Sequence, residues 1–348
     1  METLLRCWYE LKDGSRPGRS ERCVDLSNQE LIGVGLQNDL VHLPYPHNND
    51  RARLTTMVSN INLYTAFTRR SKMRMISATF AMVFAFALSF GGAHAQSEKP
   101  GVEKLYILSC GEGVAGDISL WSPGLNEGKS MDFVDSCYLI KHKQGWFLWD
   151  TGLSDSVAAL PNGLAPANPK FIYWHRAKTL AAQLAELNVV PSDIKKMAVS
   201  HTHPDHIGNV ELFPQAMLYV QKAEYEWPNP DGTPRFKPEH PVTKVEGDLD
   251  VFGDGSLVLL STPGHSPGHQ VLLVKLPKTG NIVLSGDLAH FMGNWENRGV
   301  PTFNISKEQS LSSMQRVADI LKKENATLWI NHDKVQRDGQ KLSPAFYD

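Results

Sequence analysis

Four residues with metal-binding side chains lie close together in the stretch AVSHTHPDHIGNV, residues 198–210. They are His201, His203, Asp205 and His206. Imidazole nitrogens and carboxylate oxygens are common zinc ligands, whereas a hydrophobic core seldom contains such a cluster. Alternate side chains of an extended segment point the same way, so His201 and His203 should converge on one ion. Asp205 and His206, at the start of a predicted helix, would then face a second ion.

Three further ligand candidates follow at predicted strand ends or in tight turns. His265 stands in STPGHSPGHQ, where glycine and proline favour a rigid turn. Asp287 ends the run NIVLSGD, and His332 follows the run TLWIN. A sheet holds side chains at its strand ends in place, and this gives the fixed geometry that metal ions require.

Short apolar runs must position these residues. Runs rich in β-branched or aromatic residues and bounded by turn formers predict strands at 105–110, 137–142, 146–150, 197–200, 217–221, 257–261, 270–276, 281–287 and 327–333. Helical periodicity predicts helices at 177–188 and 306–325, and the second helix opens with Ser306 and Gln309 at the spacing of a capping box. Strands in meanders with interspersed helices predict two sheets with helices packed outside.

The series HxHxDH, GHxxGH, a strand-ending Asp and a late His resembles the metallo-β-lactamase superfamily. The WDTG at 149–152 resembles the early DTG element of that superfamily. The resemblance implies an α+β fold, a four-layer αββα sandwich. It also implies that Asp150 orients a ligand histidine. His269 is expected to support its turn without binding metal.

The same resemblance implies two Zn²⁺ per chain with seven protein ligands. His201, His203 and His265 would bind one zinc, Asp205, His206 and His332 would bind the other, and Asp287 would bridge the two. Seven ligands leave open positions on both ions for a hydroxide and a substrate.

Within the superfamily, STPGHSPGHQ and the INHD at 330–333 followed by a short tail resemble the N-acyl homoserine lactonases. That family opens the lactone ring of bacterial quorum-sensing signals, which is quorum quenching. The implied mechanism is attack of a zinc-bridging hydroxide on the lactone carbonyl, with Asp205 carrying a proton to the leaving alkoxide. The family often has Tyr three positions after the bridging Asp. Here that position is His290, so His290 is predicted to donate a hydrogen bond to the carbonyl.

The expected partner is a small-molecule substrate with an acyl chain. The loop-like segment 153–174 ends in four large residues, Phe171, Ile172, Tyr173 and Trp174, and Phe291, Met292 and Trp295 follow the bridging ligand. These residues are expected either to form a wall for the acyl chain or to belong to the ordinary core.

Two alternatives to a lactonase remain open at the level of sequence. One is another dizinc hydrolase of the same fold, acting on a β-lactam, ester, organophosphate or thioester. The other is a protein without catalytic activity, in which zinc only stabilises the fold or is stored.

The first part of the chain has the layout of an export signal. Basic residues at 69–74 precede an uncharged, mostly apolar run at 76–90 and the small-residue stretch GGAHA. We expect a signal peptide at 73–95 cut after Ala95, a hydrolase domain at 96–348, and a doubtful or disordered extension at 1–72. The run is shorter than the roughly 20 residues of a membrane span, so no stable membrane insertion is expected after cleavage. The predicted location is periplasmic or secreted.

Net charge and cysteine content bear on two further properties, nucleic-acid binding and disulfide bonding. The net charge of −2 over 348 residues gives no reason to expect a nucleic-acid partner. The predicted mature chain contains Cys110 and Cys137. Export permits a disulfide. Two cysteines alone, however, do not have the pattern of a disulfide-stabilised fold, so we expect them to be two small buried residues.

Overall fold

The structure, a computed structural model, describes residues 101–348, so the predicted extension and signal peptide lie outside the described residues. Two sheets organise this part of the chain. The larger sheet has seven strands in the order β4-β1-β2-β3-β5-β6-β7, and the smaller has five in the order β12-β11-β10-β9-β8.

The larger sheet begins with an antiparallel meander and continues with parallel strands. Its strands are β1 (Val102–Ala115), β2 (Met131–His142), β3 (Gly145–Trp149), β4 (Ile172–His175), β5 (Ile194–Ala198), β6 (Met217–Gln221) and β7 (Val242–Val245). In the smaller sheet β12 runs parallel to β11, and the other pairs are antiparallel. Its strands are β8 (Leu249–Asp250), β9 (Leu257–Ser261), β10 (Gln270–Leu276), β11 (Gly280–Leu284) and β12 (Ala326–Trp329).

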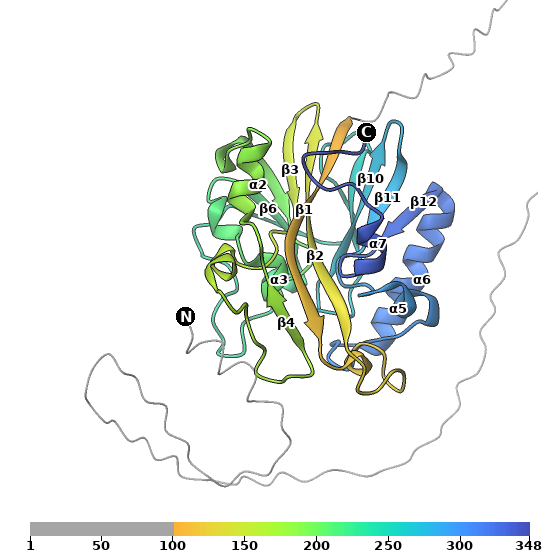
Figure 1. Cartoon of the computed structure of the whole chain (residues 1–348). Coiled ribbons are helices and arrows are strands. Elements are labelled where there is room, and N and C mark those ends of the chain that lie inside the picture. Colours follow the sequence, from red (N-terminus) through yellow and green to blue (C-terminus); the bar gives the residue numbers. More distant parts are fainter. Residues whose placement is uncertain (1–100) are drawn as a thin grey trace, which may run out of the picture. The chain divides into compact units, whose positions relative to one another are not determined.

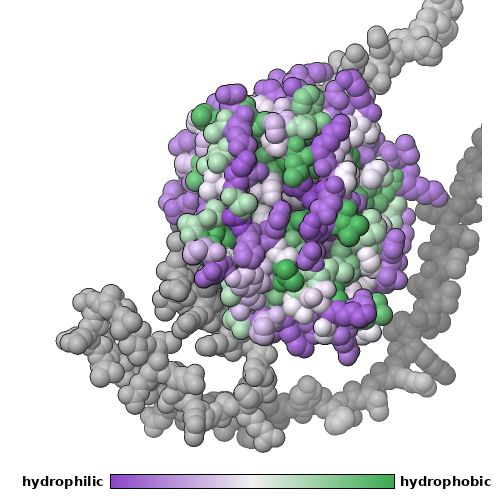
Figure 2. Space-filling view, viewed as in Figure 1, coloured by the Kyte–Doolittle hydropathy of each residue, from purple (hydrophilic) through white to green (hydrophobic). Residues whose placement is uncertain are grey.

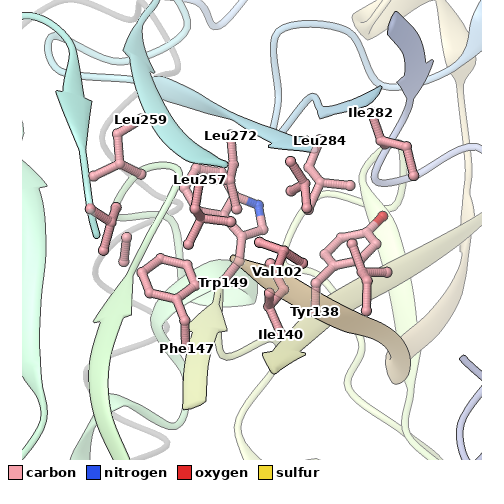
Figure 3. Close-up of a cluster of buried hydrophobic side chains, with 14 of the residues drawn as sticks. Val102, Tyr138, Ile140, Phe147, Trp149, Leu257, Leu259, Leu272, Ile282 and Leu284 are labelled. Atoms are coloured by element: carbon pink, nitrogen blue, oxygen red, sulfur yellow. The ribbon is translucent and has the colours of Figure 1, made fainter. Parts of the chain in front are cut away.

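The main core lies between the two sheets. Phe147 and Trp149 of the larger sheet face Leu257, Leu272 and Leu284 of the smaller one, and all five side chains are fully buried (Figure 3). Each sheet therefore presents an apolar inner face, and their contact accounts for the continuous apolar patterns of the central strands.

Helices cover the outer faces. Helix α2 (Leu180–Glu186) packs on a second apolar cluster, formed on the larger sheet, and α6 (Lys307–Glu324) packs on a third, formed on the smaller sheet. Figure 1 shows these two helices on opposite sides of the sheet pair. The predicted α+β, four-layer αββα sandwich is confirmed.

The predicted start of α6 is also confirmed, because the Ser306 side chain accepts a hydrogen bond from the backbone N–H of Gln309. Strands β4, β7 and β8 and several short helices were not predicted from the sequence. Strand β4 lies at the edge of the larger sheet, inside the segment predicted as a loop. Its side chains follow no clear alternation, since two are half-buried and one is exposed. The missed helices include α4 (Lys222–Tyr225), α5 (Met292–Asn297) and α7 (Lys334–Asp338), whereas α3 (Pro204–Ile207) is the helix predicted to contain Asp205 and His206.

The two cysteines of the predicted mature chain form a disulfide, so the expectation of two separate buried residues is wrong. Cys110 in β1 and Cys137 in β2 have Cα atoms 5.9 Å apart. Because β1 and β2 pair along their whole length, residues far apart in sequence come to lie side by side. A β-bulge next to Ser109 adjusts the register there, a detail that no spacing rule predicts.

The visible surface is mixed, with hydrophilic residues interspersed among smaller apolar areas (Figure 2). Within residues 101–348, none of the helices combines the length and the hydropathy required to cross a bilayer.

Candidate metal centre

The structure brings all seven predicted ligands together where strands end. His201 and His203 follow β5, His206 lies in α3 with Asp205, and the other three follow β9, β11 and β12. Their ligand atoms form two groups, and the atoms of each group lie within 4.8 Å of one another. The first ligand group is His201, His203 and His265 with Asp287, and the second ligand group is Asp205, His206 and His332.

The first ligand group is a tight triangle of imidazole nitrogens. His201 Nε2 lies 2.9 Å from His203 Nδ1, and His265 Nε2 lies 3.1 and 3.0 Å from these two atoms. A tetrahedral zinc with Zn–N bonds of 2.0–2.1 Å holds its ligand nitrogens about 3.3 Å apart. The spacing of the triangle therefore fits a shared cation.

Asp287 stands between the two groups. Its Oδ2 lies 3.2 Å from His265 Nε2 and 3.6 Å from His201 Nε2. Its Oδ1 lies 3.2 Å from His206 Nε2 and 3.0 Å from His332 Nε2. Each carboxylate oxygen thus faces a different group, which is the arrangement that a bridging ligand needs.

The second ligand group is oriented through the ring nitrogens that point away from its centre. His206 Nδ1 lies 3.0 Å from Asp150 Oδ2, and His332 Nδ1 donates to the backbone carbonyl of Val134 at 2.7 Å. Their Nε2 atoms are therefore unprotonated in the neutral rings and point inward. His206 Nε2 and Asp287 Oδ1 are buried without a hydrogen-bond partner in the described structure. A bound cation would satisfy both of these atoms, so the donor set fits a metal ion.

The electrostatic setting differs between the groups. Burial, together with the neighbouring imidazoles, lowers the pKa of His201 and His203 well below the ordinary value. Burial also opposes protonation of His332, but Asp287 and Asp205 outweigh it and raise the pKa of His332 to about 9. In the same way Asp287 and Asp150 raise the pKa of His206. The second group thus favours a positive charge at its centre.

Two supporting residues have the contacts predicted for them. Asp150, in the turn after β3, accepts a hydrogen bond from the backbone N–H of Ser200 and holds His206. His269 Nε2 accepts from the backbone N–H of Asp287 at 2.9 Å, and it belongs to neither ligand group. The proton of His269 is therefore on Nδ1, which lies 3.1 Å from the carbonyl of Thr262.

His290 lies at the edge of the centre. It is buried, and its Nε2 lies 3.0 Å from Asp287 Oδ2, while its Nδ1 has no hydrogen-bond partner within the described residues. Burial lowers the pKa of His290 to about 4, although Asp287 partly offsets this effect. The ring is thus neutral at neutral pH and carries a single N–H.

Aromatic rings border the first ligand group. The ring of Phe303 lies 6.0 Å from the rings of both His265 and His290, and Phe171 lies 5.7 Å from Phe303. Trp121 contacts both phenylalanines. Of the residues predicted to form the wall, Phe171, Ile172, Trp174 and Phe291 belong to the apolar cluster that contains Trp121 and Phe303. Met292 and Trp295 instead pack on the core beneath α6.

Phe303 and its neighbour Asn304 were not predicted from the sequence as residues of the site. Asn304 Oδ1 lies 2.9 Å from His265 Nδ1 and fixes the orientation of that ring. Both residues lie in the segment before α6, and no motif marks them. Only the fold brings them beside a turn near residue 265.

Comparison with known proteins agrees with this geometry. The profile of the family described as the metallo-beta-lactamase superfamily matches residues 132–322. The chain belongs to the metallo-β-lactamase superfamily. Divalent metal binding is therefore the expected property of the two ligand groups, and they lie where the fold brings the strand ends of its two sheets together.

Relatives of this chain include N-acyl homoserine lactonases. N-acyl homoserine lactonase AttM of Rhizobium radiobacter is 33% identical over 241 residues, which cover 64% of this chain and 91% of that protein. An N-acyl homoserine lactonase of a Bacillus species is 31% identical over 251 residues, covering 70% of this chain and 99% of that protein.

A solved structure of an N-acyl homoserine lactone hydrolase, with N-hexanoyl-L-homoserine bound at its catalytic metal center, matches with a TM-score of 0.62. It is 28% identical and covers 71% of this chain and 99% of that one. The similarity therefore extends over nearly the whole described part of the chain.

Proposed function

We propose that this protein is a zinc-dependent hydrolase that opens the lactone ring of N-acyl homoserine lactones. The observation that carries the proposal is Asp287, whose two oxygens face two complete ligand groups. Lactonase relatives at about 30% identity support the choice of a lactone as the substrate class. When bound, two zinc ions would supply a Lewis acid and a water acidic enough to be hydroxide at neutral pH.

The residues of the chain would have separate roles in this reaction. Hydrolysis consumes one water, breaks the ring C–O bond and places a proton on the leaving alcohol oxygen. Asp205, whose side chain is 18% exposed, is the most accessible acid at the centre and would carry that proton. His290 would donate its N–H to the lactone carbonyl as negative charge develops there. In the absence of substrate this N–H faces Asp287.

The acyl chain would lie against Phe171 and Phe303, the two half-buried rings of the aromatic cluster. Each methylene buried against such a surface contributes about 0.8 kcal/mol to binding. Longer acyl chains should therefore bind more tightly until the aromatic surface is fully covered.

We further propose that the protein acts in the periplasm or outside the cell after cleavage at Ala95. The disulfide between Cys110 and Cys137 supports this location, because disulfides form and persist in oxidising compartments. Mass spectrometry of the exported protein should find Gln96 at the N-terminus. Recovery of an active, exported protein that retains Met1 would contradict this part of the proposal.

A substrate panel tests the proposed activity. The purified zinc-loaded chain would be assayed with acyl homoserine lactones, nitrocefin, lactoylglutathione and paraoxon. The proposal predicts the highest kcat/KM for the lactones. A preference for any of the other three would assign the centre to a different hydrolase reaction, and a metal-loaded chain inactive on the whole panel would contradict the proposal.

A further inference from the structure

A buried carboxylate outside both ligand groups connects the two loops that carry the first group. Glu224 lies in α4 and has no exposed surface. Its Oε1 accepts hydrogen bonds from the backbone N–H and the hydroxyl of Thr202, at 2.8 and 2.6 Å. Its Oε2 accepts from the hydroxyl of Ser266 at 2.7 Å and from the backbone N–H of Gly268 at 2.9 Å. Four donors thus saturate one buried acid.

The residues that Glu224 binds are the immediate neighbours of metal-ligand candidates. Thr202 lies between His201 and His203, and Ser266 directly follows His265. The carbonyl of Thr202 accepts from Arg235 at 3.2 Å, so all three hydrogen-bonding atoms of Thr202 are occupied. The side chains on either side of Thr202 are therefore held in one orientation.

The packing of the second loop depends on the same helix. A Cβ atom added to Gly268 would lie 2.4 Å from the backbone nitrogen of Glu224 and 2.6 Å from its Cβ. Glycine at this position lets the turn approach α4 closely enough for the Gly268 N–H to reach the carboxylate.

We infer that Glu224 is a positioning residue for the first ligand group, which it holds in metal-binding geometry by tying the two histidine loops together. The inference rests on the proposed metal centre. Hydrogen bonds to an ionised acceptor are shorter and stronger than neutral ones, which suits a residue that must join two loops. The second ligand group has its own supports, Asp150 for His206 and the Val134 carbonyl for His332. Loss of Glu224 should therefore affect the two groups unequally.

The test is Glu224→Gln in the full chain, with zinc binding measured by competition with a chromophoric chelator. An amide offers one acceptor where the carboxylate offers two, so its NH₂ group would face two donors. The variants His265→Ala and His332→Ala identify which of the two binding events belongs to each group. We expect Glu224→Gln to weaken the event lost in His265→Ala by about 10- to 100-fold, the usual effect of removing an outer partner of a metal ligand. The other event should change by less than about threefold, well below that range.

Asp150→Asn is the matched control, since it also converts a buried acid to its amide but supports His206. Asp150→Asn should weaken the binding event lost in His332→Ala and leave the event lost in His265→Ala nearly unchanged. Two milder variants guard against misfolding of Glu224→Gln: Thr202→Val removes only the hydroxyl donor to Oε1, and Ser266→Ala removes only that to Oε2. Both should weaken the same event as Glu224→Gln, by smaller factors, at an unchanged melting temperature of the metal-free protein.

The outcomes separate the inference from the proposed function. Equal weakening of both events, or no weakening by any of the three variants, overturns the role of Glu224 while the wild type still binds two metals. A wild type that binds fewer than two metals overturns the proposed dizinc centre, and the inference falls with it.

Discussion

The two ligand groups use the same side chain in opposite electrostatic settings. In the first group burial dominates, and the pKa values of His201 and His203 lie well below the ordinary value. In the second group carboxylates dominate, and the pKa of His332 is raised to about 9. The first group therefore depends on the placement of neutral lone pairs, whereas the second attracts a cation by its charge. The number of histidines alone does not describe a metal centre.

Removing the shared residue Asp287 should weaken zinc binding at both ligand groups, and it should have the largest effect of the variants proposed. Asp287→Asn takes the negative charge from between the groups, so both zinc affinities should fall by more than the 10- to 100-fold typical of outer partners. Turnover at micromolar zinc should become undetectable. Elemental analysis after gel filtration measures the bound metal, and retention of two zincs per chain would show that Asp287 does not bridge.

Removing one ligand from each group should separate the two. His265→Ala and His332→Ala should each reduce bound zinc from about two to about one per chain, because the other group keeps its own ligands. The binding event that survives should differ between the two variants in the chelator competition. If the same event survives in both, the division into two groups is wrong.

His290 offers a further test of the two ligand groups, because its Nε2 contacts Asp287 Oδ2, the oxygen that faces the first group. If its N–H donates to the substrate, His290→Ala should lower kcat by about 100- to 1000-fold at full zinc content, and His290→Tyr should recover part of the loss. If it only steadies Asp287, zinc affinity and kcat should fall together. His175→Ala, which removes an exposed histidine, is the control and should leave both quantities unchanged.

The smallest effect is expected beyond the metal ligands. Phe303→Ala should reduce the preference for long acyl chains by roughly fourfold for each methylene that loses its contact, corresponding to about 0.8 kcal/mol. The kcat/KM of hexanoyl, octanoyl and decanoyl homoserine lactones measures this preference. Phe346→Ala, at a partly exposed ring that packs on Tyr106, should leave the preference unchanged. An unaltered chain-length profile in Phe303→Ala would move the acyl site elsewhere.

The sequence predicted the parts of the centre that are local or that belong to a known motif series. The four candidates from His201 to His206 are close in sequence, and the resemblance supplied the three distant ligand candidates, which the fold brings into the same two groups. The central strands were also predicted, because apolar runs buried on both faces leave a clear pattern.

Residues that act through a single long-range contact could not be predicted in the same way. Glu224 stands in the charged stretch QKAEYEW with Glu226, and nothing local distinguishes the buried acid from the exposed one. Phe303 reaches the centre only because the segment before α6 lies beside the turn at His265. The Cys110–Cys137 disulfide depends on the register of β1 and β2. In each case the information lies in the topology and is absent from the spacing of residues along the chain.

The position of this disulfide has a consequence for how the protein is prepared. Its atoms lie directly behind Gly152, where an added Cβ would come within 2.2 Å of Cys110 Cβ. The turn that starts at Asp150 and orients His206 thus rests on a covalent link that a reducing cytoplasm does not maintain. Protein expressed in the cytoplasm and protein exported to the periplasm would then differ in whether Cys110 and Cys137, which lie beside this turn, are free thiols. Free thiol should therefore be quantified in each batch before zinc content or specific activity is compared between laboratories.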